Sequence, residues 1–473
     1  MTATEPLLVA ALDDVVARRG RTDISARSFL RDVQALAATL PASGHVLNLC
    51  TDRYRFAVGL AAAIVRAQVS VLPSTVNATT VRQLAAEHPD LYCLAETPQA
   101  EIDLRQVVFD DATRRLADDE VSMPRIPVDR VVAYVFTSGS TGVPTRHRKL
   151  WGSLVRSARI EGRRVRSYLA EDVDARLSIV ATVPPQHMYG LESSVLIAWQ
   201  SRATLVAERP FFPADIVATL EASPAPRVLV TTPFHLRALL SEATALPRVA
   251  LVLCATAPLS ASLAGEAEQR FGAPIAEIYG CTETGQIATR RPTVDAHWTL
   301  FDDVRVQVDG DEAVASGGHV DAPTRLVDCI ALADDYETTH RFALVGRSQD
   351  LVNIAGKRTS IGFLDAQLHA IDGVVDGAFF RPEDDAVLRD GVSRLGAVVV
   401  APSLTPQRLL DALRVRIDRA FLPRPLHFVD ALPRNATGKL TDATLRSIVA
   451  DCIARGRGAE PTRDVAPRAR GAA

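Results

Sequence analysis

An apolar segment rich in β-branched and aromatic residues runs directly into a short loop of glycines and hydroxyl side chains between Val132 and Pro144. Gly139 and Gly142 allow positive φ angles, so successive backbone N–H groups can converge on one anion. The sequence is not a Walker A loop, because no Gly-Lys-Ser/Thr follows the required gap. Taken alone, the pattern fits either a polyphosphate-binding loop or an ordinary turn. The six loop residues are Thr137, Ser138, Gly139, Ser140, Thr141 and Gly142.

Short β-branched runs alternate with helical patterns through the middle of the chain. This alternation predicts βαβ units on a largely parallel sheet. The predicted order is strand 227–231, helix 234–243, strand 250–254, helix 260–271 and strand 274–278. Ligands of such sheets bind beyond the strand ends, where the loops 137–142 and 279–285 both fall.

The chain is long enough for more than one hydrophobic core, since it has 473 residues of which 47% are hydrophobic. We expect a large N-terminal multi-layer α/β domain with mostly parallel sheets over 1–346, and a small mobile C-terminal α+β domain over 347–455. In the small domain we expect a strand at 395–400 and helices near 405–420 and 441–453. The Arg-, Ala-, Gly- and Pro-rich stretch 456–473 predicts a disordered tail.

Charge and cysteine usage exclude several other classes of protein. A net charge of −3 does not indicate the basic surface that a nucleic-acid-binding protein requires. The six cysteines include no Cys-x-x-Cys pair, so we expect reduced thiols in a cytoplasmic protein and no zinc site. The apolar run 57–71 is interrupted by Arg66 and Gln68, and the N-terminus lacks a signal pattern, so neither a membrane span nor export is expected.

Five segments, in order, resemble those of the adenylate-forming superfamily of acyl-CoA synthetases, aryl-CoA ligases and peptide-synthetase adenylation domains. The resemblance extends over about residues 45–445. The segments are the loop above, Val183–Leu191 (VPPQHMYGL), Ile278–Gly285 (IYGCTETG), Val345–Arg358 (VGRSQDLVNIAGKR) and Leu432–Lys439 (LPRNATGK).

The resemblance implies two half reactions that use ATP and Mg²⁺. A carboxylic acid first forms an acyl-adenylate and pyrophosphate, and a thiol of coenzyme A or of a phosphopantetheine-bearing carrier protein then displaces AMP. By resemblance Lys439 bridges the carboxylate and the α-phosphate in the first step. The small domain then rotates about 347–350 and brings Gly356 and Lys357 to the thiol channel, where a glycine leaves room for the pantetheine arm.

Further nucleotide-binding roles follow from the same resemblance. Glu283 resembles the magnesium ligand, which suits a hard carboxylate oxygen, and Thr282 would hydrogen-bond the α-phosphate. Tyr279 would stack on adenine opposite Ala257, although a core tyrosine is the alternative.

The ribose hydroxyls require a forked donor and an acidic acceptor, and Arg347 supplies the fork. By resemblance, Asp328 is assigned as the acidic acceptor of the ribose hydroxyls, while Asp334 and Asp335 are interpreted as turn residues.

The acyl pocket is expected around the segment after Val183 and the glycine before the Thr-Glu pair. His187 resembles a histidine that gates this pocket, with a plain helix-start histidine as the alternative. Met188 stands where amino-acid-activating domains carry an aspartate, which argues against an α-amino acid substrate because its ammonium would be buried unpaired. The predicted pocket residues are His187, Met188, Tyr189, Gly190, Gly280 and Cys281.

The chain also departs from the general family pattern. The usual Pro-Lys-Gly after the phosphate loop is replaced by Pro144 followed by Thr-Arg-His-Arg-Lys, so the lysine is displaced to Lys149 and its reach to the phosphates is open. Gln349 stands where many relatives have an Asp or Lys hinge. The segment from Pro144 to Trp151, together with 47–56, 71–73 and 354–361, is similar to the small aryl-acid ligases of aryl polyene and xanthomonadin-type pigment pathways.

This subgroup implies a hydroxybenzoate- or hydroxycinnamate-like acid and a separate acyl carrier protein or coenzyme A as acceptor. Three alternatives stay open: a fatty-acyl or other acyl-CoA synthetase, a stand-alone amino-acid adenylation domain, and a non-catalytic nucleotide-binding descendant. The last would be expected to lose Lys439, Glu283 or Arg347, and all three are present.

Overall fold

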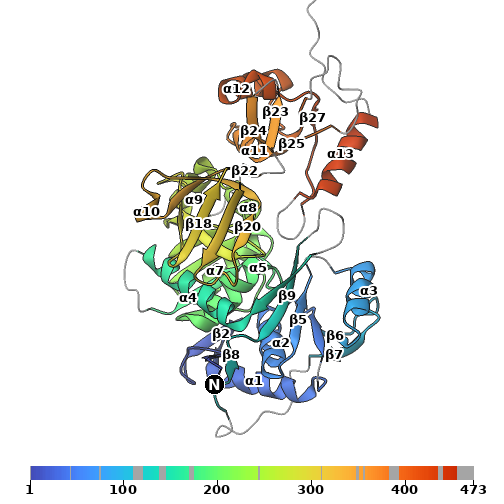
Figure 1. Ribbon diagram of the computed structural model, residues 1–473, viewed down its shortest axis with the longest axis vertical. Coiled ribbons are helices and arrows are strands. Elements are labelled where there is room, and N and C mark those ends of the chain that lie inside the picture. Colours follow the sequence, from blue (N-terminus) through green and yellow to red (C-terminus); the bar gives the residue numbers. More distant parts are fainter. Residues whose placement is uncertain are drawn as a thin grey trace, which may run out of the picture. The chain divides into compact units, whose positions relative to one another are not determined.

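The computed structural model divides the chain into two compact units, shown in Figure 1. Unit 1 comprises 1–326, 330–344 and 436–438, and unit 2 comprises 327–329, 345–435 and 439–473. The division after Leu344 lies two residues from the expected domain boundary. The structure describes residues 2–42, 44–73, 76–109, 121–137, 145–169, 175–242, 245–310, 312–347, 351–354, 357–382, 394–434 and 440–454.

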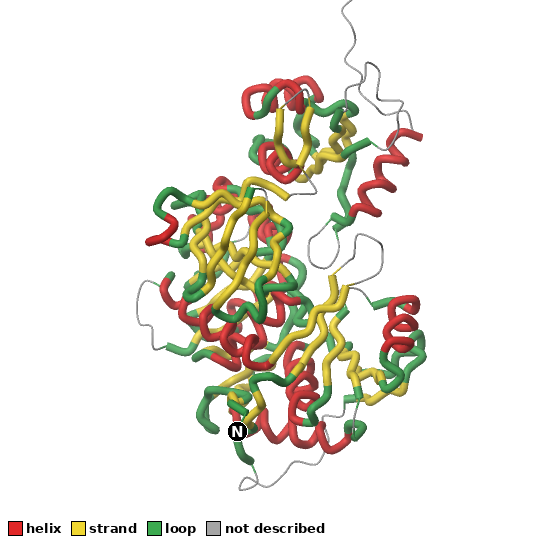
Figure 2. Tube along the Cα trace, viewed as in Figure 1, coloured by secondary structure: helices red, strands yellow, loops and turns green. Residues whose placement is uncertain are grey.

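The first half of unit 1 is built on a six-stranded sheet in the order β10-β9-β5-β4-β6-β7. Its strand pairs are parallel except for the antiparallel pair β9 and β10. The strands are β4 (His45–Asn48), β5 (Val69–Leu72), β6 (Leu91–Ala95), β7 (Arg105–Val108), β9 (Val131–Thr137) and β10 (Thr145–Leu150), with helices α1 (Ala26–Thr39), α2 (Arg53–Val65) and α3 (Ala78–Glu87). Figure 2 shows the long strands β9 and β10 running side by side.

An eleven-stranded sheet forms the second half, in the order β21-β22-β17-β16-β15-β14-β13-β11-β12-β2-β3. Its central strands, from β15 to β2, are all parallel. The pairs β15–β16, β16–β17, β17–β22 and β2–β3 are antiparallel. The strands are β2 (Val15–Arg19), β3 (Thr22–Ser25), β11 (Leu177–Ala181), β12 (Ala203–Val206), β13 (Arg227–Thr231), β14 (Leu251–Cys254), β15 (Ile275–Cys281), β16 (Gly285–Arg290), β17 (Trp298–Leu300), β21 (Asp328–Leu332) and β22 (Arg341–Arg347).

Helices between these strands complete the βαβ units. They are α4 (Trp151–Ser167), α5 (Met188–Gly190), the π-helix η2 (Leu191–Leu196), α6 (Ile197–Gln200), α7 (Pro213–Ala222), α8 (Pro233–Ser241), α9 (Ala261–Phe271) and α10 (Tyr336–Thr339). Local sequence sets their ends: Ser260 caps α9 by accepting from the Leu263 N–H, and Gly272 ends it in the left-handed conformation. The five strands and helices predicted over 227–278 are confirmed.

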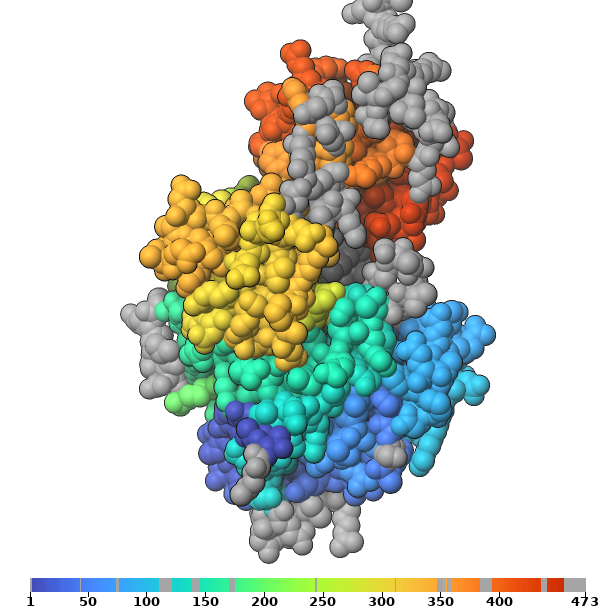
Figure 3. All heavy atoms as spheres, viewed as in Figure 1, coloured from blue at the N-terminus to red at the C-terminus, as the bar shows by residue number. Residues whose placement is uncertain are grey.

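Two smaller sheets complete unit 1. They pair β1 (Thr4–Pro6) with β8 (Arg125–Pro127), and β18 (Val304–Asp309) with β19 (Glu312–Gly317) and β20 (Thr324–Leu326). In the space-filling view, the blue residues of the six-stranded sheet and the yellow residues of the three-stranded sheet form separate parts of the surface of unit 1 (Figure 3). The predicted α/β class with mostly parallel sheets is confirmed.

Unit 2 is a small α+β unit with its own hydrophobic core. Its elements are β23 (Leu351–Ile354), β24 (Lys357–Ser360), α11 (Ile361–His369), β25 (Asp376–Phe380), β26 (Gly396–Val400), α12 (Pro406–Arg416), the 3₁₀-helix η4 (Arg419–Phe421), β27 (Leu426–Phe428) and α13 (Asp442–Ala454). The predicted strand at 395–400 and the helices near 405–420 and 441–453 are confirmed as β26, α12 and α13, while the mobility of this unit stays a prediction.

Candidate active site

The candidate site lies at the carboxyl ends of the central parallel strands in unit 1. Strands β11, β13, β14 and β15 are neighbours in the sheet, so the loops that follow them meet at one edge. These loops hold Val183–Gly190 after β11, Thr256–Pro258 after β14 and Thr282–Thr284 after β15. Three segments that are far apart in sequence are thereby brought to one place.

The β9–β10 hairpin delivers the start of the predicted phosphate loop to the same place. Thr137 is the last residue of β9, and it pairs with Thr145 at the start of β10. Its Oγ1 lies 3.0 Å from Nε2 of His147, and that nitrogen is 3.5 Å from Oε1 of Glu283. The remaining loop residues lie outside the described residues: Ser138, Gly139, Ser140, Thr141 and Gly142.

Glu283 presents the carboxylate that the resemblance assigns to magnesium. Its side chain is 34% exposed, and its carbonyl oxygen accepts a hydrogen bond of 3.1 Å from Nζ of Lys149. A single accessible carboxylate fits Mg²⁺, which takes one or two protein oxygens and draws its other ligands from phosphates and water. Within the described segments, no group of three or more His, Cys, Asp or Glu side chains could hold a metal by itself. Thr282, beside Glu283, is half-buried.

Beneath this loop lies a buried layer of polar side chains. Glu192 accepts from the Ser157 hydroxyl at 2.6 Å, and Glu161 accepts from the Gln286 amide at 2.7 Å. Burial raises the pKa of Glu161 to about 8 and that of Glu192 to about 7, while burial lowers the pKa of Lys149 against the opposing charge of Glu192. Charges interact strongly in this buried layer, because its dielectric constant is low.

The loop that carries Thr282 and Glu283 contacts this buried layer at Gly285. Its φ is +73°, and a Cβ atom at this position would lie 2.7 Å from Oε1 of Glu192. The absence of a side chain therefore allows the loop to rest directly on the buried carboxylate.

The segment after β11 carries the predicted acyl-pocket residues. His187 begins helix α5 as its N-cap residue without a side-chain capping bond, and Met188 is buried. The hydroxyl of Tyr189 donates to the carbonyls of Thr231 at 3.2 Å and Leu253 at 3.0 Å, which ties the segment to β13 and β14. Gly190 packs so closely that a Cβ atom would lie 2.0 Å from the carbonyl oxygen of Pro184.

Tyr279 packs tightly on its neighbours in β17 and β22. Its ring centroid is 5.5 Å from that of Trp298 and 5.7 Å from that of Phe342, and the side chain is buried. Ala257, its expected partner across the adenine, follows Thr256, which adopts φ of 84°. A threonine in this region of φ is strained, and such strain often accompanies function.

Gly280 and Cys281 follow Tyr279 at the end of β15. Burial raises the pKa of the Cys281 thiol to about 11, which makes it a weak nucleophile. All six cysteines lie among the described residues, and none of them forms a disulfide.

The remaining predicted residues fall at the division between the units or in unit 2. Asp328 is the half-buried first residue of β21, while Asp334 and Asp335 lie in a turn, as expected. Lys357 is exposed and forms an ion pair with Asp418. Outside the described residues lie Gln349, Gly356, Lys439 and the side chain of Arg347.

The sequence reasoning missed Arg53, which braces the loop that carries His187. Its fully buried guanidinium donates to Ser194 Oγ at 2.6 Å and to the carbonyls of Ala181 at 2.7 Å and Val183 at 2.9 Å. Its one sequence signal is an arginine at the start of the almost wholly apolar helix α2. Glu161 and Glu192 gave a comparable signal, as isolated acids on segments that fold into buried helices.

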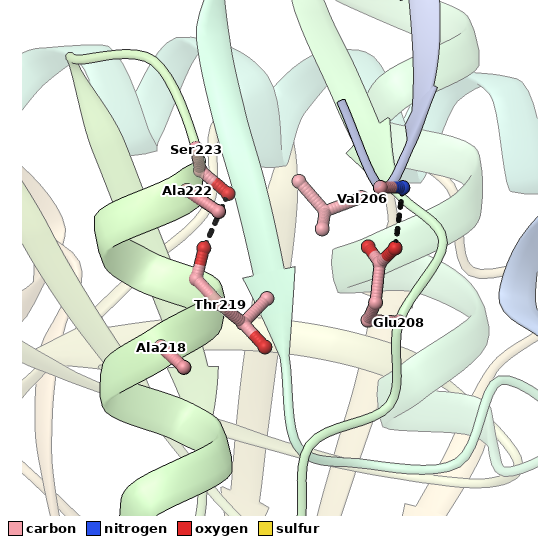
Figure 4. A pocket seen from close by; sticks show the side chains of 7 residues that line it. Val206, Glu208, Ala218, Thr219, Ala222 and Ser223 are labelled. Carbon is pink, nitrogen blue, oxygen red and sulfur yellow. Dashed lines mark hydrogen bonds between the residues drawn. The ribbon is translucent and has the colours of Figure 1, made fainter. Parts of the chain in front are cut away.

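A separate shallow groove lies between α7 and the β2–β3 turn (Figure 4). Its polar groups are already engaged: Thr219 donates to Asp215, Ser223 donates to Thr219, and the Glu208 carboxylate accepts from the Gly20 N–H. None of the predicted site residues lines it.

Residues 14–330 match the family model described as AMP-binding enzyme, and the chain belongs to this family, the adenylate-forming superfamily. Among curated relatives, a 4-coumarate–CoA ligase of Rhodobacter capsulatus is 27% identical over 310 residues, covering 65% of this chain and 74% of the relative. A 4-hydroxybenzoate–CoA/benzoate–CoA ligase of Rhodopseudomonas palustris is 25% identical over 447 residues, covering 85% and 78%.

Solved structures share the fold. The o-succinylbenzoate coenzyme A synthetase of Bacillus subtilis in complex with ATP and a magnesium ion superposes with a TM-score of 0.78 at 17% identity, covering 94% of this chain and 100% of that one. The family and the curated relatives make the chain an AMP-forming acid–thiol ligase, which adenylates a carboxylic acid with ATP and forms a thioester. None of the described helices is long and apolar enough to span a membrane.

Proposed function

We propose that the acid is a hydroxylated aryl acid of the hydroxybenzoate or hydroxycinnamate type, and that the acceptor is the thiol of an acyl carrier protein or of coenzyme A. The names of two curated relatives, a 4-coumarate–CoA ligase and a 4-hydroxybenzoate–CoA/benzoate–CoA ligase, support an aryl acid. The resemblance to the pigment-pathway ligases supports a carrier protein as acceptor.

The observation that carries the proposal is the surroundings of Met188. This buried thioether stands where an ammonium-binding carboxylate would be needed. The next carboxylate along the chain, that of Glu192 in η2, is already hydrogen-bonded to Ser157 and faces the charge of Lys149. An α-amino acid would therefore bury its ammonium without a partner, at a cost of several kcal/mol, whereas an uncharged ring would not.

The roles of the site residues are part of the proposal. Glu283 holds the metal of the MgATP complex, and Thr282 binds the α-phosphate. Arg347 and Asp328 bind the ribose, and Lys439 supplies the cation for adenylation. A rotation of the small domain then exchanges Lys439 for the Gly356 loop, so that one site serves both half reactions.

Acid-dependent ATP–pyrophosphate exchange tests the substrate. Purified protein is assayed with benzoates, cinnamates, fatty acids and amino acids, and the Lys439→Ala variant serves as the control. Selective exchange with hydroxylated aryl acids is the expected result. Selectivity for fatty or amino acids would contradict the proposed substrate, and exchange with none of the acids, despite ATP binding, would support the non-catalytic alternative.

A further inference from the structure

Strand β10 contacts the predicted magnesium ligand at two points. His147 and Lys149 are two residues apart on this strand, so their side chains leave the same face. Nε2 of His147 lies 3.5 Å from the carboxylate oxygen Oε1 of Glu283. Nζ of Lys149 donates to the carbonyl oxygen of the same residue at 3.1 Å. One strand therefore holds both the side chain and the backbone of Glu283.

The lysine is too deeply buried to serve as a free phosphate-binding cation. Lys149 is 6% exposed, and its ammonium is directed at the backbone of the loop that follows β15. It also faces the charges of the buried Glu192 and of Asp321. The displaced lysine therefore acts on the loop that carries Glu283.

His147 lies at the junction between the phosphate loop and Glu283. Its Nε2 is 3.0 Å from the hydroxyl oxygen of Thr137, the first residue of that loop. The imidazole is thus a shared neighbour of Thr137 and of the Glu283 carboxylate. The opposite face of β10 points elsewhere: the Arg146 guanidinium lies 4.7 Å from the centre of the Tyr134 ring.

We propose that His147 and Lys149 are positioning residues that fix Glu283 for the metal of MgATP, His147 at its carboxylate and Lys149 at its carbonyl. This inference rests on the proposed role of Glu283 as the metal ligand. Groups that orient a metal-binding carboxylate typically change metal affinity by about 10- to 100-fold when they are removed. The contacts of His147 and Lys149 with Glu283 also account for the departure from Pro-Lys-Gly, because these basic residues of β10 act on the loop that carries the predicted metal ligand.

Direct binding of Mn²⁺ tests the positioning of Glu283 by His147 and Lys149 without relying on turnover. The protein is loaded with α,β-methylene-ATP, which cannot be cleaved at the bond that adenylation breaks, and bound Mn²⁺ is measured from the loss of the free-ion electron paramagnetic resonance signal. We expect His147→Ala to weaken Mn²⁺ binding by about tenfold, and His147→Gln, which keeps a donor near the Nε2 position, to lose less. Affinity for the same nucleotide in EDTA should not change, whereas a general loss of structure would weaken it as well.

Arg148→Ala is the matched control, because it removes a charge from the exposed residue between His147 and Lys149. The control should bind Mn²⁺ like the wild type. An equal loss in Arg148→Ala and His147→Ala would show a bulk charge effect and overturn the proposal, as would wild-type affinity in His147→Ala. Lys149→Met is expected to weaken Mn²⁺ binding similarly, and wild-type Mn²⁺ affinity in a Lys149→Met variant that keeps its nucleotide affinity in EDTA would overturn the role of Lys149. Failure of the wild type to bind Mn²⁺ with the nucleotide would instead overturn the proposed role of Glu283.

Discussion

Replacement of Arg53 by methionine should destabilise unit 1 and loosen the loop that leads to His187. The guanidinium is fully buried and donates to the carbonyls of Ala181 and Val183 and to the hydroxyl of Ser194. Methionine fills a similar volume but donates nothing. The Ser194 hydroxyl keeps a partner, since it also donates to the carbonyl of Gly190, so two buried carbonyls lose theirs.

The magnitude follows from those two carbonyls. Each buried acceptor that loses its partner costs about 1–3 kcal/mol, which gives roughly 2–6 kcal/mol for the pair. Removal of the guanidinium also relieves its desolvation, which is why replacing buried charges by apolar groups recovers part of the loss. We therefore expect the free energy of unfolding to fall by about 2–4 kcal/mol, and Arg53→Lys, which keeps a shorter donor, to lose about half as much.

Urea unfolding followed by circular dichroism measures this change, and pyrophosphate exchange measures the effect on the site. The apparent KM for the acid should rise, because the backbone that carries His187 starts at the carbonyls held by Arg53. Arg66→Met is the control, since Arg66 is exposed at the end of the same helix and makes one long hydrogen bond of 3.3 Å to Pro41. A loss below about 0.5 kcal/mol in Arg53→Met, the range of ordinary surface substitutions, would refute this reasoning.

Three further predictions address the loop, the small unit and the lysine. Gly285→Ala should destabilise unit 1 by about 1–3 kcal/mol because of its positive φ and the Cβ contact with Glu192; unchanged urea unfolding would contradict the contact. In Asp376, burial would raise the carboxyl pKa, but hydrogen bonds from Arg434 outweigh it and hold the pKa well below its usual range. This contribution to stability is present above the unfolded pKa of about 3.9 and is lost as the pH falls below it, so Asp376→Asn should reduce the fall of unfolding free energy below pH 4, and an unchanged acid dependence would count against the ion pair. Lys439→Ala should slow adenylate formation by about 10²- to 10³-fold and largely spare thiol transfer from a supplied adenylate; equal loss of both half reactions would contradict this division.

Local sequence patterns determined the secondary structure and the candidate loops. The alternation over 227–278 predicted three strands and two helices that the structure confirms, because β-branched runs and capped amphipathic segments carry their own conformational preferences. The same patterns placed the Thr137 and Thr282 loops after strands, so the approximate place of the site could be predicted from the order of the segments. The family could also be recognised, since its segments are short and continuous in sequence.

Only the tertiary structure decided which side chains meet. The contact of His147 with Glu283 joins two different sheets, and the bonds of Arg53 to Ala181 and Val183 join residues about 130 positions apart. No local pattern encodes such pairs, because they depend on how the strands are ordered and how the sheets pack. The burial of a side chain also depends on the tertiary structure. The sequence indicated only that Lys149 is a displaced cation, whereas packing makes it a buried donor to the Glu283 loop. The reason is that the free energy of a charge depends on the solvent and the partners around it.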